Sequence, residues 1–133
     1  MSVEYRDGVD AFDADAFLAL AGRVRQDDYL RDRTAAALAR TINIGAWEDG
    51  RLIGVVRVLS DGYFFSTVTE IMVDPAHQRR GIGVELMRRA IAATPAGRLY
   101  LAAQPGTEAF FERAGFRRGP VGYVGRPEGS SLG

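Results

Sequence analysis

Hydrophobic and polar positions change period along the chain, and each change marks the boundary of an element. From Phe12 to Val24 the apolar residues recur every three or four positions, which predicts a helix over 10–24. Similar spacing predicts three further helices, at 32–40, 81–94 and 104–114. Runs rich in Val, Ile and Thr predict strands at 3–6, 42–47, 52–59, 67–73, 99–102 and 116–124. The order of elements is that of a mixed α/β domain.

Turn residues punctuate these elements. Asp49-Gly50 is the strongest hairpin signal in the chain, and Asp61-Gly62 indicates a second turn. We expect Phe64 and Phe65, just after that turn, to fill the core rather than line a cleft. Asp74-Pro75 ends the strand at 67–73, because proline has no N–H to donate to a ladder. Gly115 suits the left-handed position that follows a helix.

Composition narrows the classes of function. The 133 residues and 14.5 kDa suit one domain, expected at 1–126, with a Gly, Pro and Ser-rich tail at 127–133 that frays. Without cysteine, and with His77 as the single histidine, thiolate catalysis and multi-histidine metal sites are excluded. All 17 cations are arginine and balance 17 acids, which argues against a general nucleic-acid binder. No basic leader and no long apolar run are present, so we expect a cytoplasmic protein without a membrane partner.

A glycine turn joins the strand at 67–73 to the helix at 81–94. It reads Gln78-Arg79-Arg80-Gly81-Ile82-Gly83. The first amides of a helix lack acceptors and attract anions, and Arg79 and Arg80 would add charged donors there. The spacing is not the dinucleotide fingerprint, and the P-loop lysine is absent. The turn therefore predicts a pyrophosphate cradle; the simpler alternative is a glycine-rich turn with solvated arginines.

Two blocks carry a resemblance to a known family. The segment at 73–87, which contains this turn after Val-Asp-Pro, resembles the acyl-CoA motif of the GNAT superfamily of N-acetyltransferases. The segment at 110–116, Phe-Phe-Glu-Arg-Ala-Gly-Phe, resembles the family's next block, usually Phe-Tyr-Glu-Lys-x-Gly-Phe. The resemblance covers roughly 44–116. It implies a single α/β domain with a mixed, mostly antiparallel central sheet and helices on both faces, and it is compatible with a homodimer.

The same resemblance implies acetyl-CoA as cosubstrate and no metal. Backbone amides from Arg79 to Val84 would hold the pyrophosphate, and the strand edge at 71–73 would pair with the pantetheine arm. An N–H near Ile71 would polarise the thioester carbonyl. Gln104 is either near the CoA arm or a plain turn residue. The expected cofactor-binding residues are Ile71, Met72, Val73, Gln78, Arg79, Arg80, Gly81, Ile82, Gly83, Val84, Gln104 and Phe111.

Glu70 is the candidate for the catalytic acid–base role. It is the one carboxylate in an otherwise apolar strand, and family members often bind or deprotonate the amine from this position. Phe111 stands where the family commonly has a tyrosine that protonates the leaving thiolate. Tyr123, on the predicted last strand, is a second candidate for that hydroxyl, or an ordinary sheet residue.

Weaker candidates lie elsewhere. Tyr29, in the break between the first two helices, is a candidate substrate contact on the acceptor side, or an anchoring aromatic in a solvated loop. We expect Arg57 to pair with an acid across the sheet and His77 to be an exposed loop residue.

These observations predict transfer of an acetyl group from acetyl-CoA to a primary amine of a small molecule or peptide, by direct attack in a ternary complex. The alternative is a non-catalytic CoA-binding sensor or regulatory module, which Phe111 favours. An unrelated phosphate-binding domain is disfavoured by the second block.

Overall fold

The sheet of the protein has four antiparallel strands in the order β1-β2-β3-β4. The computed structural model describes residues 2–26, 28–95 and 97–127. The strands are β1 (Glu4–Asp7), β2 (Ile42–Glu48), β3 (Arg51–Ser60) and β4 (Ser66–Val73). The helices are α1 (Ala14–Arg23), α2 (Arg31–Leu38), α3 (Ile82–Ala93) and α4 (Glu108–Arg113), with short 3-10 turns η1 (Gly8–Asp10) and η2 (Pro75–His77).

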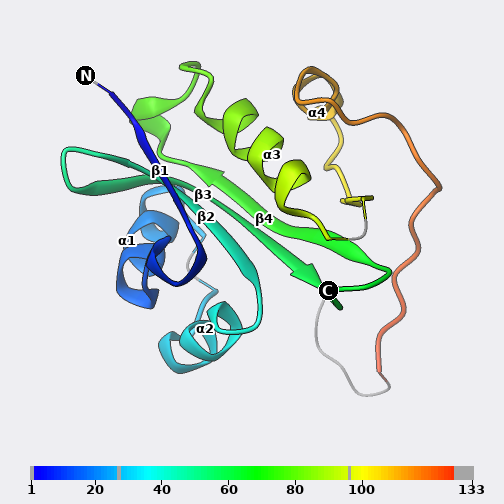
Figure 1. Cartoon of the computed structure of the whole chain (residues 1–133), viewed down its shortest axis with the longest axis horizontal. Helices are drawn as coiled ribbons and strands as arrows, with labels where there is room; N and C mark the ends of the chain where they lie inside the picture. Colours follow the sequence, from blue (N-terminus) through cyan, green and yellow to red (C-terminus); the bar gives the residue numbers. More distant parts are fainter. Residues whose placement is uncertain (1, 27, 96, 128–133) are drawn as a thin grey trace.

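Helices cover both faces of this sheet, as predicted (Figure 1). On one face α1 buries Phe17 and Leu20 against Val55. On the other face α3 buries Leu86 against Val56. Neighbouring residues of β3 therefore enter different cores, because side chains alternate across a strand. The sheet is a wall between the two helical layers.

A bulge in β4 sets the position of the candidate carboxylate. Val68 pairs with Val58 and Glu70 pairs with Arg57, so Thr69 is an extra residue opposite no partner. Strict alternation along a regular strand would place Val68 and Glu70 on one face, and the bulge separates them. Val68 packs in the core under α3, whereas Glu70 joins Arg57 on the α1 side.

The two predicted turns form, with different outcomes for the residues beside them. Asp49 and Gly50 both have positive φ, 52° and 74°, and close the β2–β3 hairpin. At the β3–β4 turn, one carboxylate oxygen of Asp61 accepts the N–H groups of three residues, Tyr63, Phe64 and Phe65. This cap turns the chain outward, so Phe64 is 86% exposed and the expected core position is wrong.

The C-terminal part departs most from prediction. The strand expected at 99–102 is a single parallel bridge between Thr67 and Tyr100. The helix expected from 104 begins at Glu108, after Pro105 and a Gly106 with φ of 91°. Within the described residues, 116–124 contains no strand, because the glycines and Pro120 there find no strand partner. This segment instead passes along the edge of the molecule (Figure 1).

Candidate active site

The N-terminus of α3 offers backbone amides to an anion. Gly81 is the residue before the helix, with φ of 80°, and no side chain caps the helix there. The first intrahelical bond runs from the N–H of Glu85 to the carbonyl of Gly81, at 3.0 Å. The amides of Ile82, Gly83 and Val84 therefore have no acceptor within the helix. Together with the positive end of the helix dipole, they suit a pyrophosphate.

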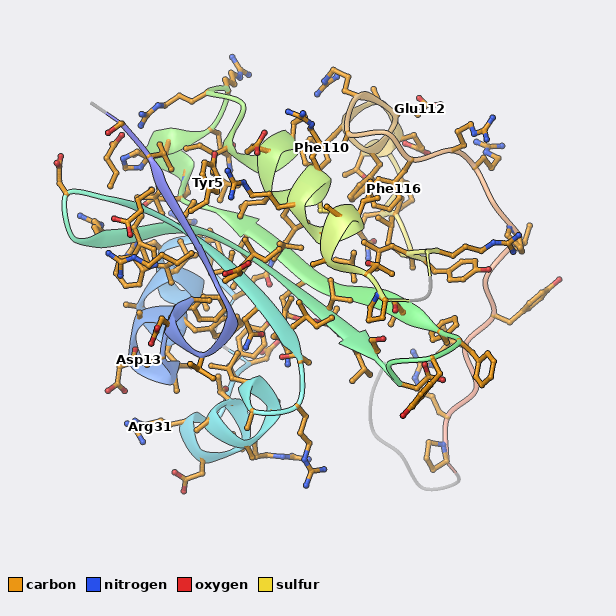
Figure 2. The ribbon with its side chains drawn as sticks, viewed as in Figure 1. Tyr5, Asp13, Arg31, Phe110, Glu112 and Phe116 are labelled. Atoms are coloured by element: carbon orange, nitrogen blue, oxygen red, sulfur yellow. The ribbon has the colours of Figure 1, made fainter. Side chains whose placement is uncertain are left out.

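The two glycines of the motif are needed for different reasons. At Gly81 the positive φ demands glycine, and a Cβ there would meet no atom within 4 Å. At Gly83 a Cβ would lie 3.0 Å from the ring of Phe110 on α4. Figure 2 shows Phe110 and Phe116 between α4 and α3. Gly81 thus leaves space outside the helix, while Gly83 lets α4 pack against it.

The free edge of β4 leads to this helix terminus. The N–H of Asp74 donates to the carbonyl of Ile53 on β3 at 2.8 Å. Because backbone groups alternate, Ile71 and Val73 direct theirs to the opposite side. There the carbonyl of Val73 accepts from the Gln78 side chain at 3.3 Å.

Met72 does not share this exposure. Its backbone faces β3, and its side chain is buried under α1, so it contributes no group to the free edge. After the Thr67–Tyr100 bridge, the described residues contain no further strand pairing with β4 on this side. Of the three strand residues expected to meet the cosubstrate, two present backbone groups there.

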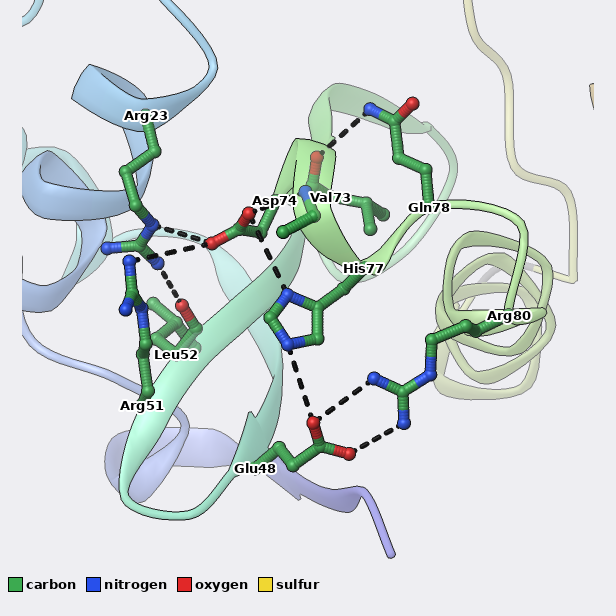
Figure 3. Close-up of polar contacts among 10 residues, drawn as sticks. Arg23, Glu48, Arg51, Leu52, Val73, Asp74, His77, Gln78 and Arg80 are labelled. Atoms are coloured by element: carbon green, nitrogen blue, oxygen red, sulfur yellow. Dashed lines mark hydrogen bonds and ion pairs between the residues drawn. The ribbon is translucent and has the colours of Figure 1, made fainter. Parts of the chain in front are cut away.

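A buried carboxylate binds an arginine of the glycine turn (Figure 3). Glu48, the last residue of β2, accepts two bonds from the Arg80 guanidinium, at 3.1 and 2.6 Å. Its side chain is 5% exposed, and the Arg80 guanidinium holds the pKa of Glu48 below its usual range. In this structure the Arg80 guanidinium is bound to Glu48, and the donation to a phosphate expected of Arg80 stays a prediction. Arg79, by contrast, is exposed and has a φ of 64°.

A second buried carboxylate, Asp74, lies beside the first. It accepts from Arg23 on α1 at 2.7 Å and from the N–H of Ala76 at 2.9 Å. Burial raises the pKa of Asp74, but these two bonds outweigh it and leave the pKa below its ordinary value. Two elements distant in sequence, α1 and η2, are thereby fastened to the end of β4.

His77 lies between the two carboxylates, so the expectation of an exposed loop residue is wrong. Its Nε2 is 3.4 Å from Glu48, and its Nδ1 is 3.7 Å from Asp74. The Nδ1 atom is buried without a hydrogen-bond partner among the described residues. Glu48 was not predicted as a site residue, although an acid that ends an apolar strand was an available signal.

On the α1 side of the sheet, Glu70 forms an ion pair with Arg57. Both carboxylate oxygens accept from the guanidinium, at 2.7 and 3.0 Å, and the two side chains are 12% and 15% exposed. The expected pairing of Arg57 across the sheet is confirmed, with Glu70 as its partner.

Tyr29 shares this environment. It packs edge-on against Phe17, and burial together with the negative charge of Glu70 raises the pKa of the Tyr29 hydroxyl. A cavity of about 240 Å³ opens here, lined among others by Tyr29, Arg33 and Arg57. The structure therefore brings Tyr29 and Glu70 together, as the sequence suggested, and adds Arg57.

The other site predictions have mixed outcomes. Phe111 packs edge-on against Phe110 and Phe116, at ring separations of 5.0 and 6.1 Å. Tyr123 is 93% exposed on a segment without strand structure, so its expected place on a last strand is wrong. The carbonyl of Gln104 accepts from the hydroxyl of Thr107 at 2.6 Å, which makes Gln104 a turn residue before α4.

None of the helices in the described residues has the length and apolar character needed to span a bilayer. Across residues 2–26, 28–95 and 97–127, no group of three or more His, Asp or Glu side chains is placed to hold a metal ion.

Comparison with known proteins identifies the class. The sequence profile of the Acetyltransferase (GNAT) family matches residues 9–116, which is most of the chain. The protein belongs to this family.

Particular relatives are more distant. The chain is 33% identical over 81 residues to GCN5-related N-acetyltransferase 2, chloroplastic, of Arabidopsis thaliana. The matched region covers 59% of this chain and 31% of that protein. It is 46% identical over 65 residues to mycothiol acetyltransferase of Brachybacterium faecium, covering 48% of this chain and 18% of that protein. The chain spans about a third of the length of the first curated relatives it matches.

Solved structures share the fold over nearly the whole chain. A GNAT family acetyltransferase from Streptococcus pneumoniae superposes with a TM-score of 0.77 at 20% identity, covering 95% of this chain and all of that one. A ribosomal-protein-alanine N-acetyltransferase from Brucella melitensis superposes with a TM-score of 0.69 at 21% identity, covering 94% and 99%. The single α/β domain with helices on both faces is therefore confirmed as a GNAT fold.

Proposed function

We propose that this protein transfers the acetyl group of acetyl-CoA to a primary amine of a small molecule or peptide, by direct attack within a ternary complex. One observation carries the proposal: three features meet on β4. Its free edge presents Ile71 and Val73, it leads to the uncapped amides of α3, and its Glu70 binds Arg57, which lines a cavity on the other side of the sheet. Family membership supports acetyl-CoA as the acyl donor.

The cosubstrate fits the groups that this chain presents. The amides of Ile82, Gly83 and Val84 would hold the pyrophosphate, since anions bind at uncapped helix N-termini. The free backbone groups of Ile71 and Val73 would pair with the amides of the pantetheine arm. When bound, acetyl-CoA supplies a thioester whose carbonyl carbon accepts the amine. An N–H at Ile71 would donate to the carbonyl oxygen as negative charge develops on it.

The amine must lose a proton before it attacks, because an alkylammonium with a pKa near about 10.4 is protonated at neutral pH. Glu70 would bind the ammonium and pass its proton to water. Arg57 already occupies both oxygens of Glu70, so an incoming ammonium shares that carboxylate with the guanidinium. Arg57 therefore fixes the orientation of Glu70 while reducing its net attraction for the amine.

The reaction balances without a protein acid. A C–N bond forms at the acceptor, the C–S bond of the thioester breaks, and the sulfur takes a proton. Phe111 cannot donate that proton, and Tyr123 is exposed on the C-terminal segment. We propose that water donates this proton to the sulfur. A thiolate is a fair leaving group, so no stronger acid is needed.

An amine acceptor is supported by two relatives. One is a ribosomal-protein-alanine N-acetyltransferase of known structure, and the other is a GCN5-related N-acetyltransferase. Both names favour nitrogen as the atom acetylated by the present protein.

Two measurements test the proposal. Thermal unfolding with acetyl-CoA at 100 times its Kd should show about 2.7 kcal/mol of stabilisation, with none from NAD or ATP. Thiol release is then followed with a panel of primary amines, and the acetylated product is identified by mass. A thermal shift without thiol release from any amine would support the CoA-binding module instead, and no shift with acetyl-CoA would contradict both.

A further inference from the structure

A groove continues from the acceptor cavity along the α2 side of the sheet. The first cavity, of about 240 Å³, and a second, of about 450 Å³, share Arg33, Ala37 and Arg57 as lining residues. The second extends to Arg40 and to Thr69, the bulge residue next to Glu70. The groove therefore runs from Tyr29, past Arg57, the partner of Glu70, to the end of α2.

The face that α2 turns to this groove has a particular composition. Arg33, Ala36, Ala37 and Arg40 all line it, and their spacing of three, four and seven places them on one side of a helix. The turn continues past the last helical residue, because the N–H of Arg40 donates to the carbonyl of Ala37 at 2.9 Å. Two short alanines thus leave open space between two long cations. Thr34 is the only buried residue of α2, so this face does not serve the core.

Acidic and basic residues are unevenly distributed along the groove. Near Tyr29 the first cavity is lined by Asp28, and the Glu70 carboxylate lies close by. Among the described residues, no acidic side chain lines the second cavity, where Arg33 and Arg40 stand together with Arg57. The charge of Arg57 is balanced by Glu70, whereas Arg33 and Arg40 have no carboxylate partner among the described residues. The acidic groups therefore lie at the Tyr29 end, together with Arg33 and Arg57, whereas the charged residues described at the other end are all cations and suit an anion.

We propose that the amine acceptor carries an anionic group, which Arg33 and Arg40 bind in the second cavity while its amine reaches Glu70. This inference rests on the proposed function and names its substrate class. Arginine pairs with carboxylates and phosphates through parallel N–H donors, so either anion would satisfy the two guanidinium groups. A neutral tail would gain no such contact, and a cationic tail would be repelled by the two guanidinium groups.

Matched acceptors test the charge alone. Glycine, 4-aminobutanoate and 6-aminohexanoate are compared with their carboxamides, and 1,4-diaminobutane supplies a cationic tail. A charge-assisted contact contributes about 1.5–3 kcal/mol, so we expect kcat/KM to favour the best carboxylate over its amide by about tenfold to a hundredfold. Aminoethyl phosphate, in the same assay, distinguishes a phosphate preference from a carboxylate preference. Equal kcat/KM for every acid–amide pair would overturn the inference.

Variants locate the effect. Arg33→Glu should remove the preference for the carboxylate and raise activity with 1,4-diaminobutane, while Arg33→Gln should only remove the preference. Arg88→Gln is the control, because Arg88 is exposed on α3 across the sheet and pairs only with Glu85. A preference that persists unchanged in Arg33→Glu and in Arg40→Glu would contradict the assignment.

A binding readout separates the two proposals. Calorimetric titration of the protein saturated with CoA should show tighter binding of the carboxylate than of the amide, whether or not transfer occurs. Acetylation of all amines without this difference would overturn the inference and leave the proposed function standing. Preferential binding of the carboxylate without acetylation would support the groove and contradict the proposed function.

Discussion

The two sides of β4 achieve binding by different means. On the α3 side the groups offered to a ligand are backbone amides, and glycines leave them accessible. On the α2 side the groups are charged side chains drawn from two strands, a loop and a helix. The first arrangement suits a donor molecule shared across a family, and the second suits an acceptor that differs among its members.

The two sides also differ in how their charges are anchored. Behind the glycine turn, Glu48 and Asp74 are buried and each is bound by an arginine. In the groove, Arg33 and Arg40 are exposed and have no carboxylate partner among the described residues. The paired carboxylates hold the backbone in place, whereas the two unpaired arginines are available to bind a ligand.

The largest effect is expected from the glycine that opens the α3 terminus. In Gly81→Val, a side chain at φ of 80° costs roughly 1–3 kcal/mol and displaces the first amides. We expect the KM for acetyl-CoA to rise on the order of a hundredfold. Gly62→Val is the matched control: its φ is 84°, also with nothing within 4 Å, but it lies in the β3–β4 turn. Similar KM values for the two variants would refute the role of the amides.

The next effect concerns the acceptor carboxylate. Glu70→Gln removes the charge that receives the ammonium, and we expect kcat/KM for the amine to fall about thirtyfold. The KM for acetyl-CoA should stay within about twofold, because Glu70 faces away from the α3 side. Glu4→Gln, which removes an exposed carboxylate paired with Arg6, is the control. An unchanged rate in Glu70→Gln would remove this residue from the mechanism.

A double-mutant cycle decides how Arg80 acts. If Arg80 positions the turn through Glu48, then Glu48→Gln and Arg80→Gln each raise the KM for acetyl-CoA about tenfold, and the double variant is no worse. Unchanged kcat would accompany these changes. Additive effects would instead mean that Arg80 leaves Glu48 and contacts the cosubstrate directly.

Asp74 should make stability depend on acid pH. Its pKa is lower in the folded protein than in the unfolded chain, where it is near about 3.9. The stabilisation is therefore present above that value and is lost as pH falls through the folded pKa. Chemical denaturation from pH 7 to pH 3 should show this loss, and Asp74→Asn should reduce it. Asp49→Asn, in the exposed β2–β3 turn, should retain the wild-type slope.

The smallest effects concern the missing proton donor. Tyr123→Phe should change kcat by less than about twofold, because the Tyr123 side chain is almost fully exposed. Phe111→Tyr should give no rate increase, since Phe111 packs against two other phenylalanine rings. A steep loss of kcat in Tyr123→Phe would show that the C-terminal segment reaches the reaction.

Much of the cofactor side could be predicted from the sequence. Its main signals are Asp74-Pro75, Gly81 and Gly83. Each acts on the backbone within a few residues, so its effect can be predicted from the neighbouring sequence. The reason for Gly83 was still missed, because Phe110 approaches it from a helix far along the chain.

The acceptor side was much less predictable. Glu70 was identified as a candidate, but the bulge at Thr69 that sets its face left no signal in the pattern of apolar residues. The exposed position of Phe64 was also missed, because it follows from the hydrogen bonds of Asp61 rather than from hydropathy.

The sequence by itself determined the strand–turn–helix unit, both hairpin turns and the resemblance to the GNAT family, since each follows from local backbone preference. Only the tertiary structure decided that Arg57 binds Glu70, that Glu48 takes Arg80, and that α2 lines a positive groove. Those pairings join residues from 13 to 32 positions apart. They depend on strand register and helix placement, which only the packing of the whole chain determines.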